Sequence, residues 1–395
     1  MNRAIGSIAI SGVLVASVLL MRRPMEATMP AYGVLAERLS DAPVAESFEP
    51  LGYSFLIASM PGDTIDQQAK RLHFVCYLVL AALTGWCLSR TAASHPLAST
   101  MAAAAILFNP YVLINLFRLN DNNVNVPAIA ALFMVLRWSM GIAEAHRPRL
   151  LACASALLGV VMSVRPNALT LMGVLGPVGG MREWVAGRRA RAAASALTVA
   201  GIAALAYLAC AWTITGRPLF WPSNGPYNLF AGNNPASMSM LVSEYNAETS
   251  LPMGLRWCGI DQPLRSVDAA TFTSCTIRFW KEHPVQTLSL AAMKFYTMMF
   301  RPNLRLADSP FEVALQLATM VLPLAWWAAA AAVALRRREV IDPLALAFVV
   351  LYTAPFVLTN SDPRFRLPLD AVYALSLASP SVLAKLRHAG AVLPA

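Results

Sequence analysis

Long apolar stretches separated by short polar ones make up most of the chain. Ten of them are long enough, or nearly so, to cross a hydrocarbon layer of about 30 Å, and a backbone in lipid must satisfy its hydrogen bonds internally. We therefore expect ten membrane-spanning helices, near residues 4–21, 72–92, 98–118, 124–143, 150–164, 167–180, 193–214, 311–335, 343–359 and 367–384. The pattern predicts an all-α, polytopic membrane protein with one transmembrane domain over residues 1–395.

Two larger regions interrupt the apolar pattern, residues 22–71 and residues 215–310. Both contain segments with apolar residues at helical spacing, and amphipathic segments beside a membrane typically lie in its interface. We expect interfacial helices in these two large outer loops, near 32–39, 51–57 and 284–300.

Composition and charge agree with this fold class. Hydrophobic residues make up 57% and charged residues 13% of the 395 positions, with a mean hydropathy of +0.54, whereas soluble domains contain about 25% charged residues. If the N-terminus lies inside, Lys and Arg greatly outnumber Asp and Glu in the short loops of the same side. This asymmetry predicts that both termini are cytoplasmic and that the large loops face outward. It also accounts for the net charge of +10 without nucleic-acid binding, since no basic stripe with interleaved aromatic residues occurs.

Several signatures of soluble enzymes and pumps are missing from the sequence. There is no Gly-x-x-x-x-Gly-Lys loop, no His-Glu-x-x-His and no Gly-x-Ser-x-Gly, so nucleotide-driven pumping and hydrolysis by zinc or a serine triad are not indicated. No cofactor is predicted, although outer carboxylates could hold a divalent metal. Cys258 and Cys275 both lie in the second outer loop, where an oxidising compartment favours a disulfide that staples the loop.

Two arginines, Arg364 and Arg366, flank an aromatic residue just before the last apolar stretch. Guanidinium groups at the start of a membrane helix lie at headgroup depth and can hold a lipid phosphate through paired hydrogen bonds. Alternatively, they only anchor the helix end by snorkelling. For this pair we favour the phosphate site. Arg165 and Lys294 are further candidates for it, with helix anchoring and contact with lipid headgroups as their alternatives.

Amide side chains cluster in two of the predicted outer turns. Residues 118–125 contain one acid, Asp121, and four asparagines, including Asn122 and Asn123. A turn needs only one or two such residues, so this number indicates hydrogen bonding to a polyol. Asn233 and Asn234 could likewise bind sugar hydroxyls, or could simply form a turn.

Taken in order, the outer segments resemble those of the GT-C superfamily of membrane glycosyltransferases, which includes bacterial mannosyl and aminoarabinose transferases. The resemblance rests on residues 32–39 with Gly52-Tyr53, on 118–127, on Gly-Asn-Asn-Pro at 232–235, on 282–284 and on Arg-Phe-Arg-Leu-Pro at 364–368. It implies transfer of a sugar from a polyprenyl-phosphate carrier to a hydroxyl of a glycan, lipid or protein. It also implies a site at the outer face of the bacterial inner membrane.

The implied chemistry needs a carboxylate that takes the proton of the acceptor hydroxyl and cations that stabilise the departing phosphate. The family's acid corresponds to Thr28 here, so Glu26, directly after the first span, is the first candidate for the base and Asp121 is the second. Glu26 could also be a solvated acid that balances neighbouring arginines. The resemblance further makes Tyr53 a candidate for sugar or acceptor binding.

Functions of other classes stay open at this point. A transporter or lipid flippase usually carries ionisable residues inside its spans and shows paired halves, and the sequence shows neither clearly. A non-catalytic partner that binds carrier lipid in a glycan-assembly complex is compatible with threonine at position 28. An O-antigen polymerase or ligase is a closer alternative and would use a sugar donor linked through a diphosphate. The number of arginines does not distinguish such a donor from one linked through a monophosphate.

Overall fold

The computed structural model describes residues 3–26, 30–42, 44, 47, 49–92, 95–141, 146–218, 224–237, 247–261, 267–301, 310–359, 361–379 and 381. Every element among these residues is helical, apart from one isolated bridge between Glu26 and Arg118. The predicted all-α fold class is thus confirmed for the described part of the chain. Thr28 lies outside the described residues.

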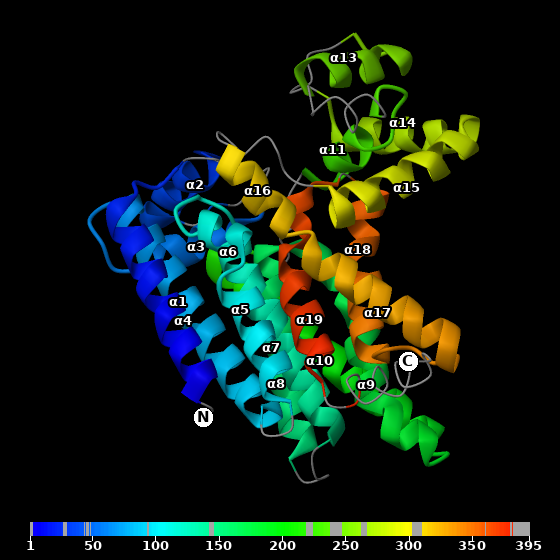
Figure 1. Ribbon diagram of the computed structural model, residues 1–395. Coiled ribbons are helices and arrows are strands. Elements are labelled where there is room, and N and C mark those ends of the chain that lie inside the picture. The colour runs from blue at the N-terminus through cyan, green and yellow to red at the C-terminus, as the bar shows by residue number, and fades with distance from the viewer. Residues whose placement is uncertain are drawn as a thin grey trace.

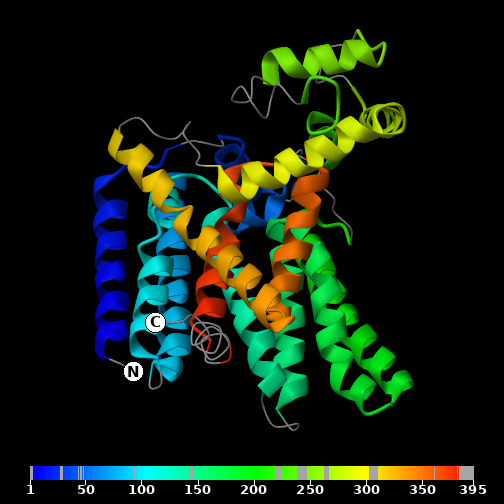
Figure 2. The same ribbon diagram turned by 45° about the vertical axis from the view of Figure 1, so that its right-hand side comes forward.

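Upright helices packed side by side form a bundle, as the two views in Figure 1 and Figure 2 show. Within the described residues, six segments are long and apolar enough to cross a membrane, which indicates an integral membrane protein. They are α1 (Arg3–Arg22), α4 (Ile65–Thr91), α5 with α6 (Pro96–Leu107 and Pro110–Asn115), α7 (Asn122–Gly141, of which Asn122–Met140 qualifies), α8 (Arg147–Val164) and α10 (Arg189–Thr215).

The other four predicted spans correspond to shorter helices, so a count of ten spans stays a prediction. These elements are η1 (Pro166–Leu171) with α9 (Met172–Val185), α17 (Val321–Arg337), α18 (Pro343–Leu358) and α19 (Leu367–Leu377). The predicted continuous helix over 311–335 was wrong, since the chain forms α16 (Pro310–Ala318) and then α17. Pro323 has no N–H with which to bond the carbonyl of Thr319 four residues earlier, and this carbonyl accepts instead from the side chain of Arg366 at 3.2 Å.

Shorter helices gather at one end of the bundle, at the top of Figure 1. They are α2 (Pro30–Asp41), α3 (Leu51–Ala58), α11 (Asn224–Ala231), α13 (Ala247–Trp257), α14 (Ala269–Glu282) and α15 (Pro284–Phe300). The helices predicted at 32–39, 51–57 and 284–300 are therefore present as α2, α3 and α15. Cys258, directly after α13, is bonded to Cys275 of α14, which staples the outer helices together.

Local sequence signals set several of these helix boundaries. Helices α5, α6, α15 and α18 begin with proline, whose fixed φ and missing N–H suit the first helical position. Thr64 caps α4 by accepting from the N–H of Gln67, and Asp342 caps α18 in the same way. Gly216 ends α10 at a φ of +68°, a left-handed conformation that glycine adopts without strain.

Two glycines allow helices to approach unusually closely. A Cβ on Gly52 would lie 2.5 Å from the backbone of Ser163, so α3 presses directly on the end of α8. A Cβ on Gly159 would lie 2.4 Å from the carbonyl oxygen of Ala203, between α8 and α10. Small residues at such contacts are typical of helices packed in membranes.

Arg366 is fully buried and connects four parts of the bundle. Its guanidinium donates to the carbonyl of Met299 at 2.7 Å and to both oxygens of Thr319. Its Nε atom lies 3.3 Å from a carboxylate oxygen of Asp370, whose other oxygen accepts from Asn109 at 3.1 Å. The side chain therefore holds the end of α15, the break before α17 and the start of α6 against α19.

Replacement of Arg366 should be strongly destabilising, because Arg366→Gln leaves the buried Asp370 carboxylate without its cation. We expect a loss of about 3–5 kcal/mol, seen as a lower thermal unfolding temperature of the detergent-purified protein. Arg364→Gln is the matched control, since Arg364 is partly exposed. Equal unfolding temperatures of the two variants would contradict this structural role of Arg366.

Candidate functional site

The polar end of the bundle begins with a short pairing of two segments, one after α1 and one after α6. The N–H of Glu26 donates to the carbonyl of Phe117 at 2.7 Å, and the N–H of Leu119 donates to the carbonyl of Glu26 at 3.1 Å. The Glu26 carboxylate then accepts from Arg118 Nε at 2.9 Å. Glu26 is half-exposed, but its charge is already paired.

Asp121 lies in the turn before α7 and is held by Arg165 through two hydrogen bonds. The nitrogen–oxygen distances are 2.6 and 2.9 Å, and both side chains are 8% exposed. Asn125 donates a third hydrogen bond at 3.2 Å, while Arg165 also donates to the hydroxyl of Tyr352. Asp121 thus holds Arg165 in place, and the guanidinium of Arg165 balances the buried negative charge of Asp121.

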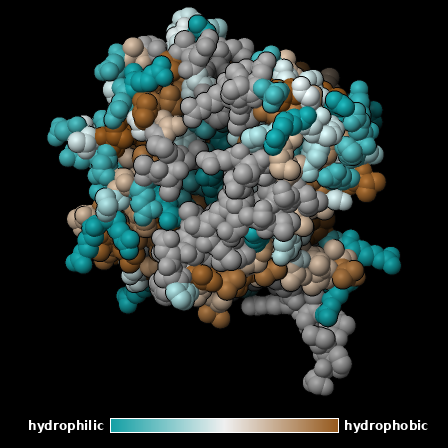
Figure 3. All heavy atoms as spheres, turned by 90° about the horizontal axis from the view of Figure 1, so that it is seen from above, coloured by the Kyte–Doolittle hydropathy of each residue, from teal (hydrophilic) through white to brown (hydrophobic). Residues whose placement is uncertain are grey.

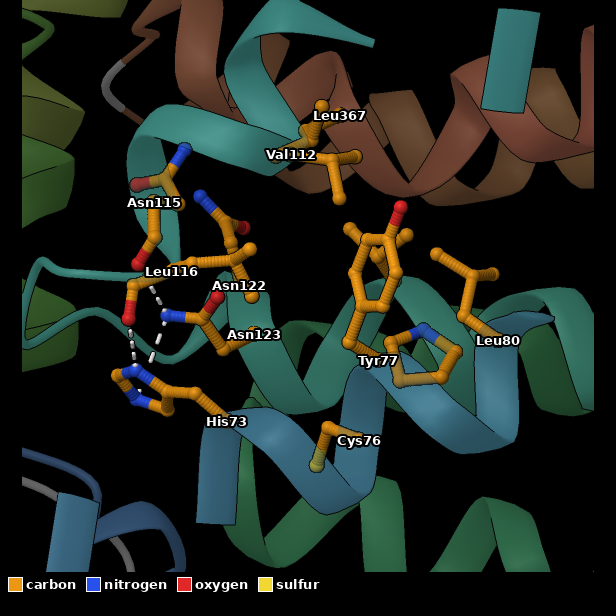
Figure 4. A pocket seen from close by; sticks show the side chains of 12 residues that line it. His73, Cys76, Tyr77, Leu80, Val112, Asn115, Leu116, Asn122, Asn123 and Leu367 are labelled. Carbon is orange, nitrogen blue, oxygen red and sulfur yellow. Dashed lines mark hydrogen bonds between the residues drawn. The ribbon is translucent and has the colours of Figure 1, made fainter. Parts of the chain in front are cut away.

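Most of the asparagines in this turn stabilise the turn itself. Asn123 donates to the carbonyls of Asn115 and Asn120 at 2.7 and 3.1 Å. Figure 4 shows its amide pointing toward His73, whose Nδ1 lies 2.7 Å from the carbonyl of Leu116. A buried network of this kind fixes the backbone, so the predicted polyol contacts do not include Asn123.

Tyr53 belongs to the same network and is fully buried. Because His73 Nδ1 must donate to a carbonyl, its Nε2 accepts from the Tyr53 hydroxyl at 2.6 Å. The hydroxyl also accepts from the N–H of Asn120 at 3.1 Å, and its ring packs edge-on against Tyr32. Tyr53 therefore stabilises the turn before α7 from inside the protein and is not accessible to a sugar.

Asn122 differs from its neighbours in having a free acceptor. Its Nδ2 atom donates to the carbonyl of Arg364 at 3.3 Å, which joins the turn before α7 to the segment before α19. Its Oδ1 atom is buried without a hydrogen-bond partner, and so is Oδ1 of Asn125. Asn122 is thus the member of this turn that keeps hydrogen-bonding capacity next to Arg364.

The two arginines of the predicted phosphate site have different surroundings. Arg366 is buried with its donors used inside the protein, as described above. Arg364 is about one-third exposed, lies 5.2 Å from the Phe365 ring centroid and has Asp362 at 3.7 Å. The structure therefore separates the pair, and only Arg364 faces the polar end with an accessible guanidinium.

Glu49 is a carboxylate that sequence reasoning missed. It is partly buried, accepts a hydrogen bond from Asn224 at 3.0 Å and precedes the proline before α3. Burial raises the pKa of its carboxyl group, the negative charge of Asp121 raises this pKa further, and the positive charge of Arg364 lowers it. In the sequence, the only signal for Glu49 as a site residue was its position as a single acid directly before an apolar interfacial helix.

Tyr32 lies among the same charges. Burial raises the pKa of its phenol well above the usual value, Asp121 and Glu49 raise it further, and Arg165 and Arg364 lower it. Four charged side chains from four separate segments thus act on one buried ring. We call Tyr32, Glu49, Asp121, Arg165 and Arg364 the outer cluster.

Seen from this end, the molecule is hollowed near its middle, and hydrophilic residues are visible within the hollow (Figure 3).

The second asparagine pair is also used by the fold. Asn233 donates to the carbonyls of Leu229 and Leu358, both at 2.7 Å. Its oxygen accepts from Trp280 at 3.1 Å and from the buried Lys294 ammonium at 3.0 Å. The Asn234 side chain instead bonds backbone atoms of residues 230 and 236. Asn234 forms a turn, and Asn233 joins the outer helices to α18.

No group of three or more His, Cys, Asp or Glu side chains lies together at metal-binding distance within the described ranges. The carboxylates of the outer cluster pair instead with arginine and asparagine side chains.

Comparison of this chain with protein-family models, with curated proteins and with solved structures finds no match.

Lys294 should make stability depend on pH. Burial lowers its pKa to about 7, whereas unfolding restores the ordinary value of 10.5. Between these values the unfolded chain binds more protons, so stability should rise with pH by about 1 kcal/mol per pH unit. Thermal unfolding at several pH values between these limits should show this slope in the wild type and lose it in Lys294→Met. The control Lys281→Met, at an exposed lysine, should keep the slope.

Proposed function

We propose that this protein is a membrane glycosyltransferase of the GT-C type. It transfers a sugar from a polyprenyl-phosphate carrier to an acceptor hydroxyl at the outer face of the bacterial inner membrane, in the glycosylation of cell-envelope glycan or lipid. The termini are cytoplasmic and the outer cluster faces outside. The observation that carries the proposal is the outer cluster itself. It brings the Glu49 carboxylate, which accepts from the neutral amide of Asn224, under the charge of Arg364, whose side chain is about one-third exposed, at the polar end of an apolar bundle. Asn122, which donates to the carbonyl of Arg364, adds an Oδ1 atom without a hydrogen-bond partner.

The outer cluster has the groups that such a transfer requires. In the reaction, the acceptor oxygen forms a bond to the anomeric carbon of the sugar, and the bond from that carbon to the phosphate oxygen breaks. The proton of the hydroxyl moves to a carboxylate, and the phosphate leaves on its carrier with its negative charge stabilised by a cation. Glu49 is the proposed proton acceptor, and Arg364 is the proposed phosphate ligand.

The choice of Glu49 over the two carboxylates favoured by the sequence rests on their partners. Glu26 is paired with Arg118, and Asp121 is held by Arg165 from two sides. Among the described contacts, Glu49 accepts its hydrogen bond from the neutral amide of Asn224, and burial raises the pKa of its carboxyl group, which favours proton uptake by its carboxylate. Asp121 then serves to position Arg165 and to raise the pKa of Glu49.

A non-catalytic protein that binds carrier lipid is the second candidate function. The pairing of both Glu26 and Asp121 with arginine favours it, because the carboxylates of both acids are already engaged by a guanidinium. Under that function Arg364 would still hold a lipid phosphate, and Glu49 would have no role in it.

Replacement of Glu49 should separate these two functions. We expect Glu49→Gln to lower transfer from radiolabelled polyprenyl-phosphate sugars to a membrane extract by about 10²-fold or more, with Glu49→Asp retaining part of the activity. The matched control is Glu37→Gln, at an exposed glutamate of α2. Transfer by the wild type that Glu49→Gln retains in full would exclude Glu49 as the base. Absence of transfer from every donor, with carrier lipid still bound, would favour the non-catalytic function.

Transfer should also depend on pH through Glu49. Because the carboxylate must be ionised to accept a proton and its pKa is raised, activity should fall on acidification at a higher pH than an ordinary glutamate would set. Arg364→Gln removes a cation that lowers this pKa, so the midpoint of the acid limb should shift upward in this variant. A profile of kcat/KM against pH measures both effects, and an unchanged midpoint in Arg364→Gln would contradict the assignment.

A further inference from the structure

A second cationic site lies at the outer end of α1 and is not used by the proposed reaction. It comprises Arg22, the last residue of α1, Arg23, which follows it, and Arg118 from the segment after α6. The guanidinium carbons of Arg23 and Arg118 lie 5.4 and 6.0 Å from the centroid of the Phe117 ring. Two cations that would repel each other are therefore held around one aromatic side chain.

The acids nearby do not balance this charge. Glu26 pairs with Arg118, as described above, so three cations face one carboxylate. Asp66 contacts the same segment through the N–H of Met25 at 2.9 Å, but its other oxygen binds Lys70 at 2.9 Å. The site thus keeps an excess of positive charge.

Arg118 also has an unused hydrogen-bond donor. Its side chain is 9% exposed, and although Nε binds Glu26, Nη1 is buried without a partner. A buried donor without an acceptor costs free energy that an incoming oxygen would restore. The favourable interaction of cations with a helix C-terminus accounts for Arg22 and Arg23, but not for Arg118, which comes from another segment.

The surface that leads to this site is apolar. Ile10, Leu14, Val18 and Met21 recur every three or four residues along α1, so they share one face of the helix, and all four are exposed, Met21 by 77%. The opposite face of α1 packs against α4 and α5. A continuous apolar stripe on a predicted membrane span therefore ends at the cations, which is the arrangement that a lipid with an anionic headgroup matches.

We propose that the outer end of α1 binds the phosphate of a membrane lipid, with Arg118 and Arg23 donating to the phosphate oxygens and the acyl chains lying along the exposed face of α1. This site is separate from the outer cluster, since the ion pairs formed by the described residues of the two groups share no member. The inference does not depend on the proposed transferase activity.

Native mass spectrometry of the full-length protein in detergent tests this site. The probes are phosphatidylglycerol, diacylglycerol with the same chains, and inorganic phosphate. We expect phosphatidylglycerol to bind more tightly than the other two, and Arg23→Gln and Arg118→Gln each to weaken its binding about tenfold, the loss expected for one charge-assisted hydrogen bond. Arg38→Gln, at an exposed cation of α2, is the matched control and should bind like the wild type.

The remaining outcomes overturn the proposal. Equal binding of diacylglycerol would show that the phosphate is not recognised, and equal binding of inorganic phosphate would indicate a free-anion site instead of a lipid site. Unchanged binding in Arg23→Gln would exclude the site even if Arg118→Gln does not fold, because Arg23 is exposed and its replacement removes no hydrogen bond that the structure shows.

Discussion

The buried pair of Asp121 and Arg165 organises the polar end of this molecule. Neither charge could remain at that depth alone, because an unpaired buried ion carries a large desolvation penalty. The pair therefore fixes the turn before α7 against the junction of α8 and η1, and the hydrogen bond from Arg165 to Tyr352 extends this connection to α18. The consecutive helices α7 and α8 and the distant helix α18 thus meet at one ion pair.

The pair of Asp121 and Arg165 also gives the two acids Asp121 and Glu49 different roles. The guanidinium of Arg165 holds the Asp121 carboxylate, so Asp121 acts on its surroundings through its negative charge. Glu49 has no guanidinium partner within hydrogen-bonding distance among the described contacts, and burial and the charge of Asp121 both raise the pKa of its carboxyl group. The two acids thus have different partners, a guanidinium for Asp121 and a neutral amide for Glu49.

The apolar pattern was sufficient to predict the fold class and the helices α2, α3 and α15, because these depend on local spacing. It could not predict that the carbonyl of Thr319, at the break before α17, is bonded by Arg366 far along the chain. For the same reason the pattern of arginines did not show that Arg366 is buried while Arg364 is accessible. The sequence did not identify Glu49 as a site residue, because its environment comes from Asn224, Asp121 and Arg364, which lie in three other segments.

Because Gly52 has no side chain, α3 can lie in close contact with α8, and this contact affects how the outer cluster is positioned. Because α3 lies directly on the backbone of Ser163, it has almost no freedom to slide or rotate on the end of α8. Glu49 lies two residues before the start of α3, and Arg165 lies two residues after Ser163, so Glu49 and Arg165 are both attached to this contact. The distance between Glu49 and the Asp121–Arg165 pair is then set by the packing of α3 on α8, as it would be for two residues on the same helix.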